Sequence, residues 1–411
     1  MAFTGATAGL AAGAQTNDTR MDFALEATYA TPPSGNYQAL RITGESFSRG
    51  QTTARPEEIN ALKEVSQSVV TQVSASGTIS GALSSGTFDD LIAGVMGSDW
   101  NIQTYSGSDG FELIIEQKNS LYSGVDDIYL KNSSGSIVGI NDVHGFVAIN
   151  INDNNDNITS SNLFTYSNIN PGVYIVPAGT LKSGGTFKDF TVTIASLVNS
   201  NIDKTFTIRK KLLGNFLLYP GSLITQVQIQ LQQAQFGTVS VDVTSATELK
   251  SDTDIAAAVL PAPSGAVHNS VNNFLGATIF GKVPQGCVTQ FTCTLGRDGS
   301  GNDYSMGHDD ACGVRAGQFT ASGSIEFYFR SWDEYEASIQ GTQGPIVVQT
   351  VDDSGNGYAF IFLNAALRNA KVNASQTNQT VRASFDIEGN PASGGGTFAI
   401  FRLGDFAATG A

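Results

Sequence analysis

Alternating apolar and polar residues recur along the chain and predict long antiparallel strands. In the segment 69–84, apolar side chains stand mostly at odd positions and small polar side chains at even positions. The same period of two returns at 226–232, 238–244, 318–330 and 384–388. Such strands pack one face against a core and leave the other face wet. The pattern therefore predicts a mainly β fold.

A short helix is expected after two of these strands. Thr87 is a candidate N-cap, Asp89 and Asp90 stand in the first turn, where the helix dipole favours acids, and Gly97 can end the helix. The apolar face of the second helix is formed by Trp332, Tyr335 and Ile339. Each helix is therefore predicted to pack an apolar face against the neighbouring strands.

The sequence pattern of these strands and helices occurs twice in the chain, which indicates an internal repeat. The matched pairs of segments are 73–79 with 319–325 at a spacing of 246, 88–94 with 335–341 at 247, 40–47 with 288–295 at 248, and 239–243 with 383–387 at 144. The drop in spacing means that the first copy carries about 103 extra residues, which lie between Gly94 and Phe206. Short apolar strands are expected in this insertion at 111–115, 128–130, 146–151 and 190–194.

The repeat divides the chain into five parts. They are an N-terminal arm at 1–21, a first β domain at 22–100 and 201–245, an inserted β domain at 101–200, a linker at 246–275 and a second β domain at 276–411. One helical turn is expected in the linker at 255–259.

Composition excludes several classes of protein. The chain has 22 Lys and Arg against 37 Asp and Glu, a net charge of −15, and no basic run, so it is a poor ligand for phosphate backbones. No stretch approaches the ~18 apolar residues of a membrane span. The first 23 residues lack a basic region and a leucine-rich core, so export is not expected. Three Cys do not form a disulfide framework in a chain of 411 residues.

No catalytic or metal site is expected. His308, Asp309, Asp310 and Cys312 resemble a ligand cluster, but no second His or paired Cys completes a zinc set. No G-x-S-x-G elbow is present, and the three His stand in loops without a nucleophile beside them. We therefore expect no enzyme activity, no bound metal and no cofactor.

Several motifs in a fixed order resemble the tail tube proteins of long-tailed bacteriophages. They are LRITGES (40–46), ASG (75–77), GTFDDL (86–91), KTFTI (204–208), FTASGSI (319–325), DSGNGY (353–358) and TFAIFR (397–402). The resemblance implies two tube domains of the β-sandwich or barrel type, each with one short helix. The inserted all-β domain departs from this pattern, and similar proteins carry such domains outside the tube.

The resemblance also implies an assembly. Inner sheets close into a barrel within a ring, rings stack into a hollow tube, and viral DNA passes through it without specific binding. Three chains with two tube domains each would form a pseudo-sixfold homotrimer. A barrel of about 24 strands has a backbone radius of roughly 24 Å, wide enough for a DNA duplex. Other implied partners are the tape measure protein inside the tube during assembly and the tail-tip and terminator proteins at its ends. The implied location is the virion tail, with assembly in the host cytoplasm.

Two sets of residues are candidates for this function. The small, polar and acidic residues of the wet strand faces are expected to line the bore, where they offer no cationic grip to phosphates. They are Gln72, Ser74, Ser76, Thr78, Ser80, Asp242, Ser322, Ser324, Glu326, Asp386 and Glu388. The alternative is that these faces lie on the outer wall.

Two polar hairpins are expected to contact the adjacent ring, and free flexible loops are the alternative. The candidate residues are Arg55, Glu57, Glu58, Lys63, Glu64, Asp298, Asp303, His308, Asp309 and Asp310. Two other functions stay open at this point: a tail-tip or baseplate hub ring, and a surface adhesin that uses the inserted domain.

Overall fold

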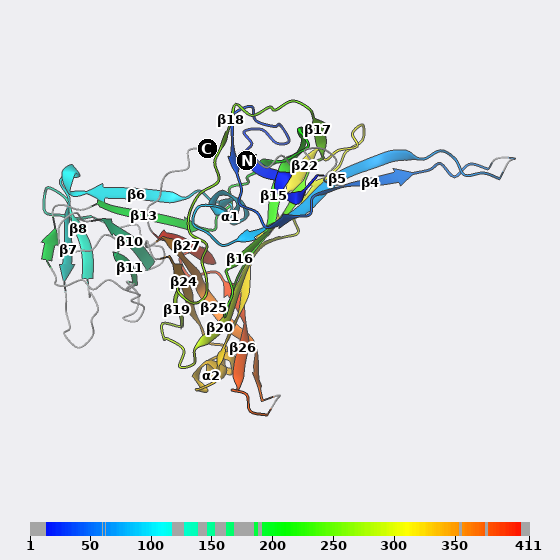
Figure 1. Cartoon of the computed structure of the whole chain (residues 1–411). Helices are drawn as coiled ribbons and strands as arrows, with labels where there is room; N and C mark the ends of the chain where they lie inside the picture. Colours follow the sequence, from blue (N-terminus) through cyan, green and yellow to red (C-terminus); the bar gives the residue numbers. More distant parts are fainter. Residues whose placement is uncertain are drawn as a thin grey trace, which may run out of the picture.

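The computed structural model of the chain is mainly β, and its described residues form two α-helices (Figure 1). It describes residues 14–59, 61, 63–116, 127–138, 146–152, 162–167, 185–187, 191–352, 356–374 and 377–403. The mainly β fold predicted from the alternating residues is confirmed.

One continuous antiparallel sheet runs through the middle of the molecule. In spatial order its strands are β4 (Ser48–Ala54) with the short β3 (Gly44–Glu45), β5 (Val69–Ala82), β16 (Thr238–Ser245), β15 (Asn215–Gln232), β20 (Val288–Asp298), β23 (Gln318–Tyr328), β26 (Arg382–Asn390) and β25 (Gly357–Asn373). The first half of this order comes from the first part of the chain and the second half from the second. The pairing of β15 with β20 joins the two halves.

The long strands β15 and β25 each continue into a second layer. Around β15 this layer contains β1 (Arg20–Leu25), β2 (Asn36–Ala39), β14 (Phe206–Leu212), β17 (Leu249–Ser251) and β18 (Ala258–Leu260). Around β25 it contains β19 (Phe274–Ile279), β24 (Gln343–Val351) and β27 (Phe398–Leu403). The apolar faces of both layers form one large core with α1 (Asp89–Met96), and α2 (Asp333–Gln340) lies beside β25.

The strand pairings repeat in the two halves with a register that differs slightly from the sequence matches. Ser80 pairs with Gly44, and Glu326 pairs with Gln290, so the first strands correspond at a spacing of 246 rather than 248. The helices end at Gly97 and Gly341, a spacing of 244 rather than 247. Apolar residues recur every two positions in a strand and every three or four in a helix. The spacing inferred from the sequence is therefore wrong by two residues for the strands and by three residues for the helices.

Helix α1 begins one residue later than expected. Phe88 occupies its N-cap position without a side-chain cap, and the Thr87 hydroxyl lies 2.6 Å from the Ser84 hydroxyl instead. The expected C-terminal stop is confirmed, because Gly97 adopts a left-handed conformation with φ of 60°.

The segment 101–200, which is expected from the sequence to be an insertion, forms strands close to the expected positions. They are β6 (Asn101–Ser106), β7 (Glu112–Glu116), β8 (Asp127–Lys131), β9 (Ile137–Val138), β10 (Phe146–Asn152), β11 (Asn162–Ser167), β12 (Gly185–Phe187) and β13 (Thr191–Val198). The root of β13 pairs with β27 from Ala195 opposite Arg402 to Val198 opposite Ala399. Strand pairing therefore fixes the end of the segment 101–200 to the last described strand of the chain.

The expected helical turn in the linker is wrong. Residues 258–260 form β18, which pairs in parallel with β2 from Ala258 opposite Asn36 to Leu260 opposite Gln38. Pro261 and Pro263 follow, and the residue before a proline favours an extended backbone. Short 3-10 turns occur at Thr16–Asp18 and Gly107–Asp109.

Candidate functional site

The continuous sheet has one apolar and one polar face. The side chains of its apolar face lie in the core, among them Ile79, Val241, Cys293 and Phe385, each at most 1% exposed. Directly paired residues of an antiparallel sheet point to the same side, so the polar face can be followed from strand to strand. One such row runs through Gly44, Ser80, Ser240, Gln228, Thr294, Ser322, Glu388 and Ala366. The polar face is therefore continuous across the junction between the halves.

All eleven residues expected to line a bore lie on this polar face. None of them is buried: Ser76, Ser322, Asp386 and Glu388 are exposed, and the others are half-buried between their neighbours. No described element packs across the face. The alternation in the sequence thus brings these residues to one surface, from four strands that are far apart in the chain.

The acids of the polar face have partners that the sequence did not reveal. Arg368 Nε lies 2.7 Å from a carboxylate oxygen of Glu388, and Arg382 lies 2.9 Å from Glu326. The Thr78 hydroxyl donates to Asp242 at 2.6 Å. The carboxylates of Glu388 and Glu326 are therefore each paired with a guanidinium on the polar face.

The sheet ends in an unpaired edge on each side. Among the described residues, β3 and β4 pair only with β5, and the part of β25 after Arg368 pairs only with β26. Phe47 at the first edge and Ala370 and Val372 at the second are half-buried apolar side chains that pack against the core. Exposed edges with apolar residues invite pairing with another chain.

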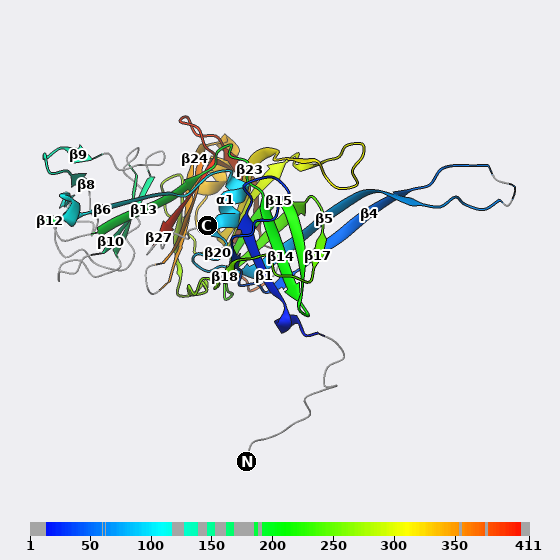
Figure 2. The same cartoon turned by 90° about the horizontal axis from the view of Figure 1, so that it is seen from above.

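The two polar hairpins have equal length and leave the same end of the sheet, but they then take different courses. The first leaves the sheet as the long, straight arm of β4 and β5 (Figures 1 and 2). The second, which contains β21 (Gly301–Asp303) and β22 (Gly313–Arg315), folds back on the first half of the chain. There Asn302 Nδ2 donates to the Ser245 carbonyl at 2.9 Å, and the Val73 amide donates to the Asp309 carbonyl at 2.6 Å.

Two glycines explain the difference in direction. Gly299 and Gly317, at the base of the second hairpin, have φ of 76° and 74°. A Cβ at Gly317 would lie 2.5 Å from the Asp298 carbonyl oxygen, so the bend requires glycine. The corresponding residues of the first hairpin, 246 positions earlier, are Thr53 and Thr71, whose β-branched side chains favour extended strands.

The hairpin side chains singled out in the sequence lie mostly in solvent. Those of the first hairpin are all exposed, and in the second hairpin only Asp310 is half-buried. Within the described residues, no group of three His, Cys, Asp or Glu could hold a metal ion. Cys312 instead donates its thiol to the Asp303 carbonyl at 3.3 Å, and all three cysteines are free.

A buried polar cluster joins α1 to the second half of the chain. Asp89 is 3% exposed and accepts hydrogen bonds from the Tyr358 hydroxyl at 2.5 Å and from Arg402 at 2.6 Å. The Gly86 amide donates to the same hydroxyl at 2.9 Å. Burial raises the pKa of Asp89, while Arg402 and Tyr358 oppose this shift. The first acid of α1 therefore acts as a structural link between the halves.

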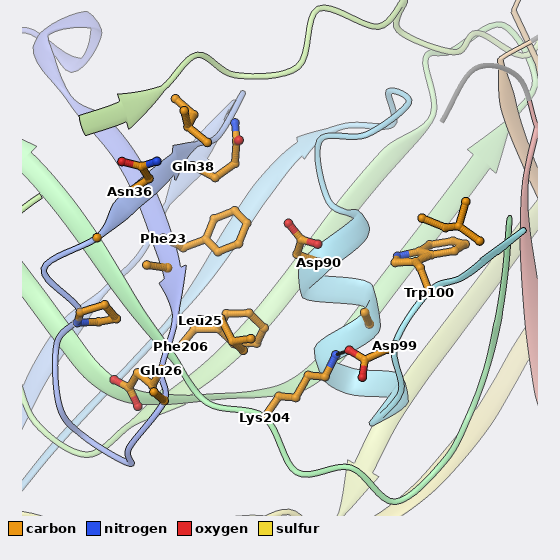
Figure 3. A pocket seen from close by; sticks show the side chains of 17 residues that line it. Phe23, Leu25, Glu26, Asn36, Gln38, Asp90, Asp99, Trp100, Lys204 and Phe206 are labelled. Atoms are coloured by element: carbon orange, nitrogen blue, oxygen red, sulfur yellow. Dashed lines mark hydrogen bonds and ion pairs between the residues drawn. The ribbon is translucent and has the colours of Figure 1, made fainter. Parts of the chain in front are cut away.

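A cavity of about 550 Å³ opens beside α1 and β1 (Figure 3). Its walls are largely apolar, with Phe23, Trp100 and Phe206 around the Asp90 carboxyl (Figure 3). Lys204 at the rim forms an ion pair with Asp99 and donates to the Ser98 carbonyl at 2.7 Å. The described lining includes no His, Cys, Ser or Thr, so it offers no nucleophile paired with a base.

Replacing Asp90 by Asn should stabilise the fold at neutral pH. Burial, and then the nearby negative charge of Asp89, raise the pKa of Asp90 to about 6. Above that pH the ionised carboxyl destabilises the folded state, and the penalty disappears as the pH falls below the unfolded pKa of about 4. We expect a gain of about 1–2 kcal/mol at pH 7.5 and little gain at pH 4.5, measured by thermal unfolding. Asp99→Asn, which removes an ion-paired carboxyl, should bring no such gain; a gain equal at both pH values would contradict this account.

No helix among the described residues is long and apolar enough to cross a membrane. None of the curated proteins searched matches the chain. A family model described as "Phage tail tube protein" matches residues 16–389, which include all the candidate residues named above and all but the last residue of the continuous sheet. With the match extending over most of its length, the chain belongs to the phage tail tube protein family and is a structural component of the phage tail.

Proposed function

We propose that three chains close into a ring, that the rings stack into a tube, and that the polar face of the sheet lines its bore as the conduit for viral DNA. One observation carries this proposal. Among the residues that the structure describes, the sheet is continuous, no element covers its polar face, and one unpaired edge remains on each side. In this interpretation the two halves of the chain are two copies of one tube domain, and each copy contributes four strands to a barrel of about 24 strands.

The junction inside the chain supplies the template for closing the ring. Strand β15 pairs there with β20, which places Ile229 opposite Cys293. The counterpart of β15 in the second half is β25, and the counterparts of β20 in the first half are β3 and β4. Transferring the register of the internal junction places Val372 of one chain opposite Phe47 of the next.

Burial supports this register. In the internal junction Ile229 and Cys293 are both 0% exposed. Their counterparts Val372 and Phe47 are only half-buried in the single chain. Pairing the two edges would remove this remaining apolar surface from water and satisfy the backbone groups of both strands.

The polar face suits a bore that DNA must pass without adhering. Its described side chains are mainly hydroxyls and amides, and the guanidinium groups of Arg368 and Arg382 stand beside Glu388 and Glu326. An Arg that is already paired contributes less to the phosphate neutralisation that drives non-specific DNA binding.

Placing new cations on this face should make the tube retain DNA. Ser322 is exposed on the polar face, in the row that includes Ser240 and Thr294. Ser322→Arg would add one guanidinium per chain to the bore, opposite a Glu388 carboxylate that is already paired with Arg368. Tubes should then bind duplex DNA with an affinity that falls as salt rises. A filter-binding titration at several salt concentrations measures this. Thr253→Arg, in an exposed loop of the second layer, is the matched control; equal binding by both variants would place Ser322 outside the bore.

The hairpins suit contacts between rings. Both leave the same end of the sheet, and the straight first hairpin carries exposed Ile59 and Val65 near its tip. The opposite end of the sheet carries exposed Phe236 and Val271. Different apolar surfaces at the two ends favour a head-to-tail contact, which repeats without closing and builds a stack. The second hairpin would pack against the first half of the chain and so stabilise the contact between the two tube domains. Its exposed side chains would face the same neighbouring ring.

The inserted domain is proposed to lie on the outside of the tube. Its root strand β13 pairs with β27 in the second layer, away from the polar face.

Microscopy of the purified full-length chain tests the proposed function. We expect trimeric rings and hollow tubes in negative stain, and a cryo-EM map with Asp386 facing the bore. Chains that stay monomeric at high concentration, or a map with Asp386 on the outer wall, would refute it.

A further inference from the structure

The two helices occupy corresponding places but differ sharply in burial. Nearly every residue of α1 is buried, whereas α2 has no buried residue. At the C-terminal end, Val95 of α1 is 0% exposed and its counterpart Ile339 of α2 is 70% exposed. The apolar face expected for the second helix is therefore present, but the single chain covers only part of it: Tyr335 packs against the core, whereas Trp332 and Ile339 stay exposed.

The difference follows from what packs on each helix. Helix α1 contacts β15, β20 and the insertion strand β13, whereas α2 contacts chiefly β25, the counterpart of β15. Strand β20 belongs to the other half of the chain. Its Arg297 is 9% exposed and donates from Nε to the Val95 carbonyl at 2.7 Å, beside Gly97 at the end of α1. A cation at a helix C-terminus is favourable because the last carbonyls carry partial negative charge.

We propose that the C-terminal end of α2 is a docking site for β4 of a second copy of this chain. The inference rests on the ring proposed above. Inside the chain, the pairing of β15 with β20 brings β20 to α1. In the ring, the pairing of β25 with the next chain would bring β4 of that chain to α2 in the same way. In the register of the internal junction, Arg49 and Gln51 of the incoming chain take the places of Leu295 and Arg297.

Charge favours the same occupant. Helix α2 carries Asp333, Glu334 and Glu336 and no base. Arg49 of the incoming strand is exposed in the single chain and would approach this acidic helix. The uncharged amide of Gln51 can donate to the Ile339 carbonyl as Arg297 donates to Val95. The insertion has no counterpart in the second half, so the remainder of α2 stays in solvent after docking.

Cysteine protection tests the docking site in assembled rings. Ile339→Cys is introduced with Cys287→Ser and Cys312→Ser; the remaining Cys293 is 0% exposed, and burial raises the pKa of its thiol. Maleimide labelling is compared between rings and the same protein carrying Val372→Glu, which is designed to stay monomeric. We expect labelling at position 339 to slow at least about tenfold in rings. Asp333→Cys, at the other end of α2, should label at the same rate in both.

The outcomes separate this inference from the ring itself. Rings that form while position 339 labels at the monomer rate would overturn the docking site and leave the ring standing. Absence of rings would overturn both.

A second measurement uses a gain of affinity. Gln51→Arg restores the cation present at Arg297, so half-maximal ring assembly should need about three- to tenfold less protein. Gln51→Glu should shift the midpoint in the opposite direction. Thr52→Arg, the next residue on the polar face, is the matched control and should leave the midpoint within about twofold. Equal effects at positions 51 and 52 would contradict the proposed contact.

Discussion

Replacing Val372 by Glu should stop the rings from closing while the chain stays folded. Val372 is half-buried in the single chain, and in the proposed ring it lies against Phe47 of the neighbour. The change removes about 1–2 kcal/mol of apolar burial at each joint and adds the cost of an unpaired buried carboxylate. A joint weakened by at least about 3 kcal/mol forms more than a hundredfold less often. Mass photometry should report monomers where the parent protein gives trimers.

The control for this prediction is Asn373→Glu. It adds the same charge one residue along the same edge, but on the polar face, where water can solvate it. Rings should still form. Circular dichroism should show folded protein for both variants. If the Val372→Glu protein forms rings as readily as the parent, the proposed pairing of β25 with β3 and β4 is wrong.

Shortening the first hairpin should give rings that do not stack. Ala54 pairs with Val69 at the end of β4 and β5, so residues 55–68 can be replaced by an Asn-Gly turn without changing the register. The change removes Ile59 and Val65, which are 105% and 79% exposed, together with the charged residues of the tip. Negative-stain images should show single rings in place of long tubes.

Shortening the second hairpin is the matched control. Its loop packs on the first half of the chain, where Ala311 is 5% exposed and its amide donates to the Ala246 carbonyl at 3.5 Å. Its loss should lower the midpoint of thermal unfolding, which the first deletion should leave nearly unchanged. Long tubes formed without residues 55–68 would show that rings stack through other contacts.

The alternation of apolar and polar residues predicted most of the strands, but it did not predict which side chains of the polar face contact each other. Alternation of residues was enough to place Ser80, Ser322 and Glu388 on one surface, because the period of a strand fixes which residues share a face. It could not reveal that Arg368 pairs with Glu388. That contact joins the neighbouring strands β25 and β26, and alternation within one strand does not encode which residues of two strands lie beside each other.

The different courses of the two hairpins could have been predicted from the residues at their bases. Gly299 and Gly317 flank the second hairpin, and Thr53 and Thr71 stand at the same places in the first. A pair of glycines opposite each other at the base of a hairpin predicts a bend. The exposure of Ile339 could not be predicted in this way. The sequence pattern of an apolar helix face is the same whether the face is covered by its own chain or by a neighbouring chain.

The pairing of β15 with β20 inside one chain would change how ring assembly depends on protein concentration. In a ring of six tube domains, half of the joints then exist before any two chains meet. The equilibrium amount of rings would rise with the third power of the chain concentration, where six separate domains would require the sixth power. Fewer chains would therefore have to meet for a ring to close at low protein concentration.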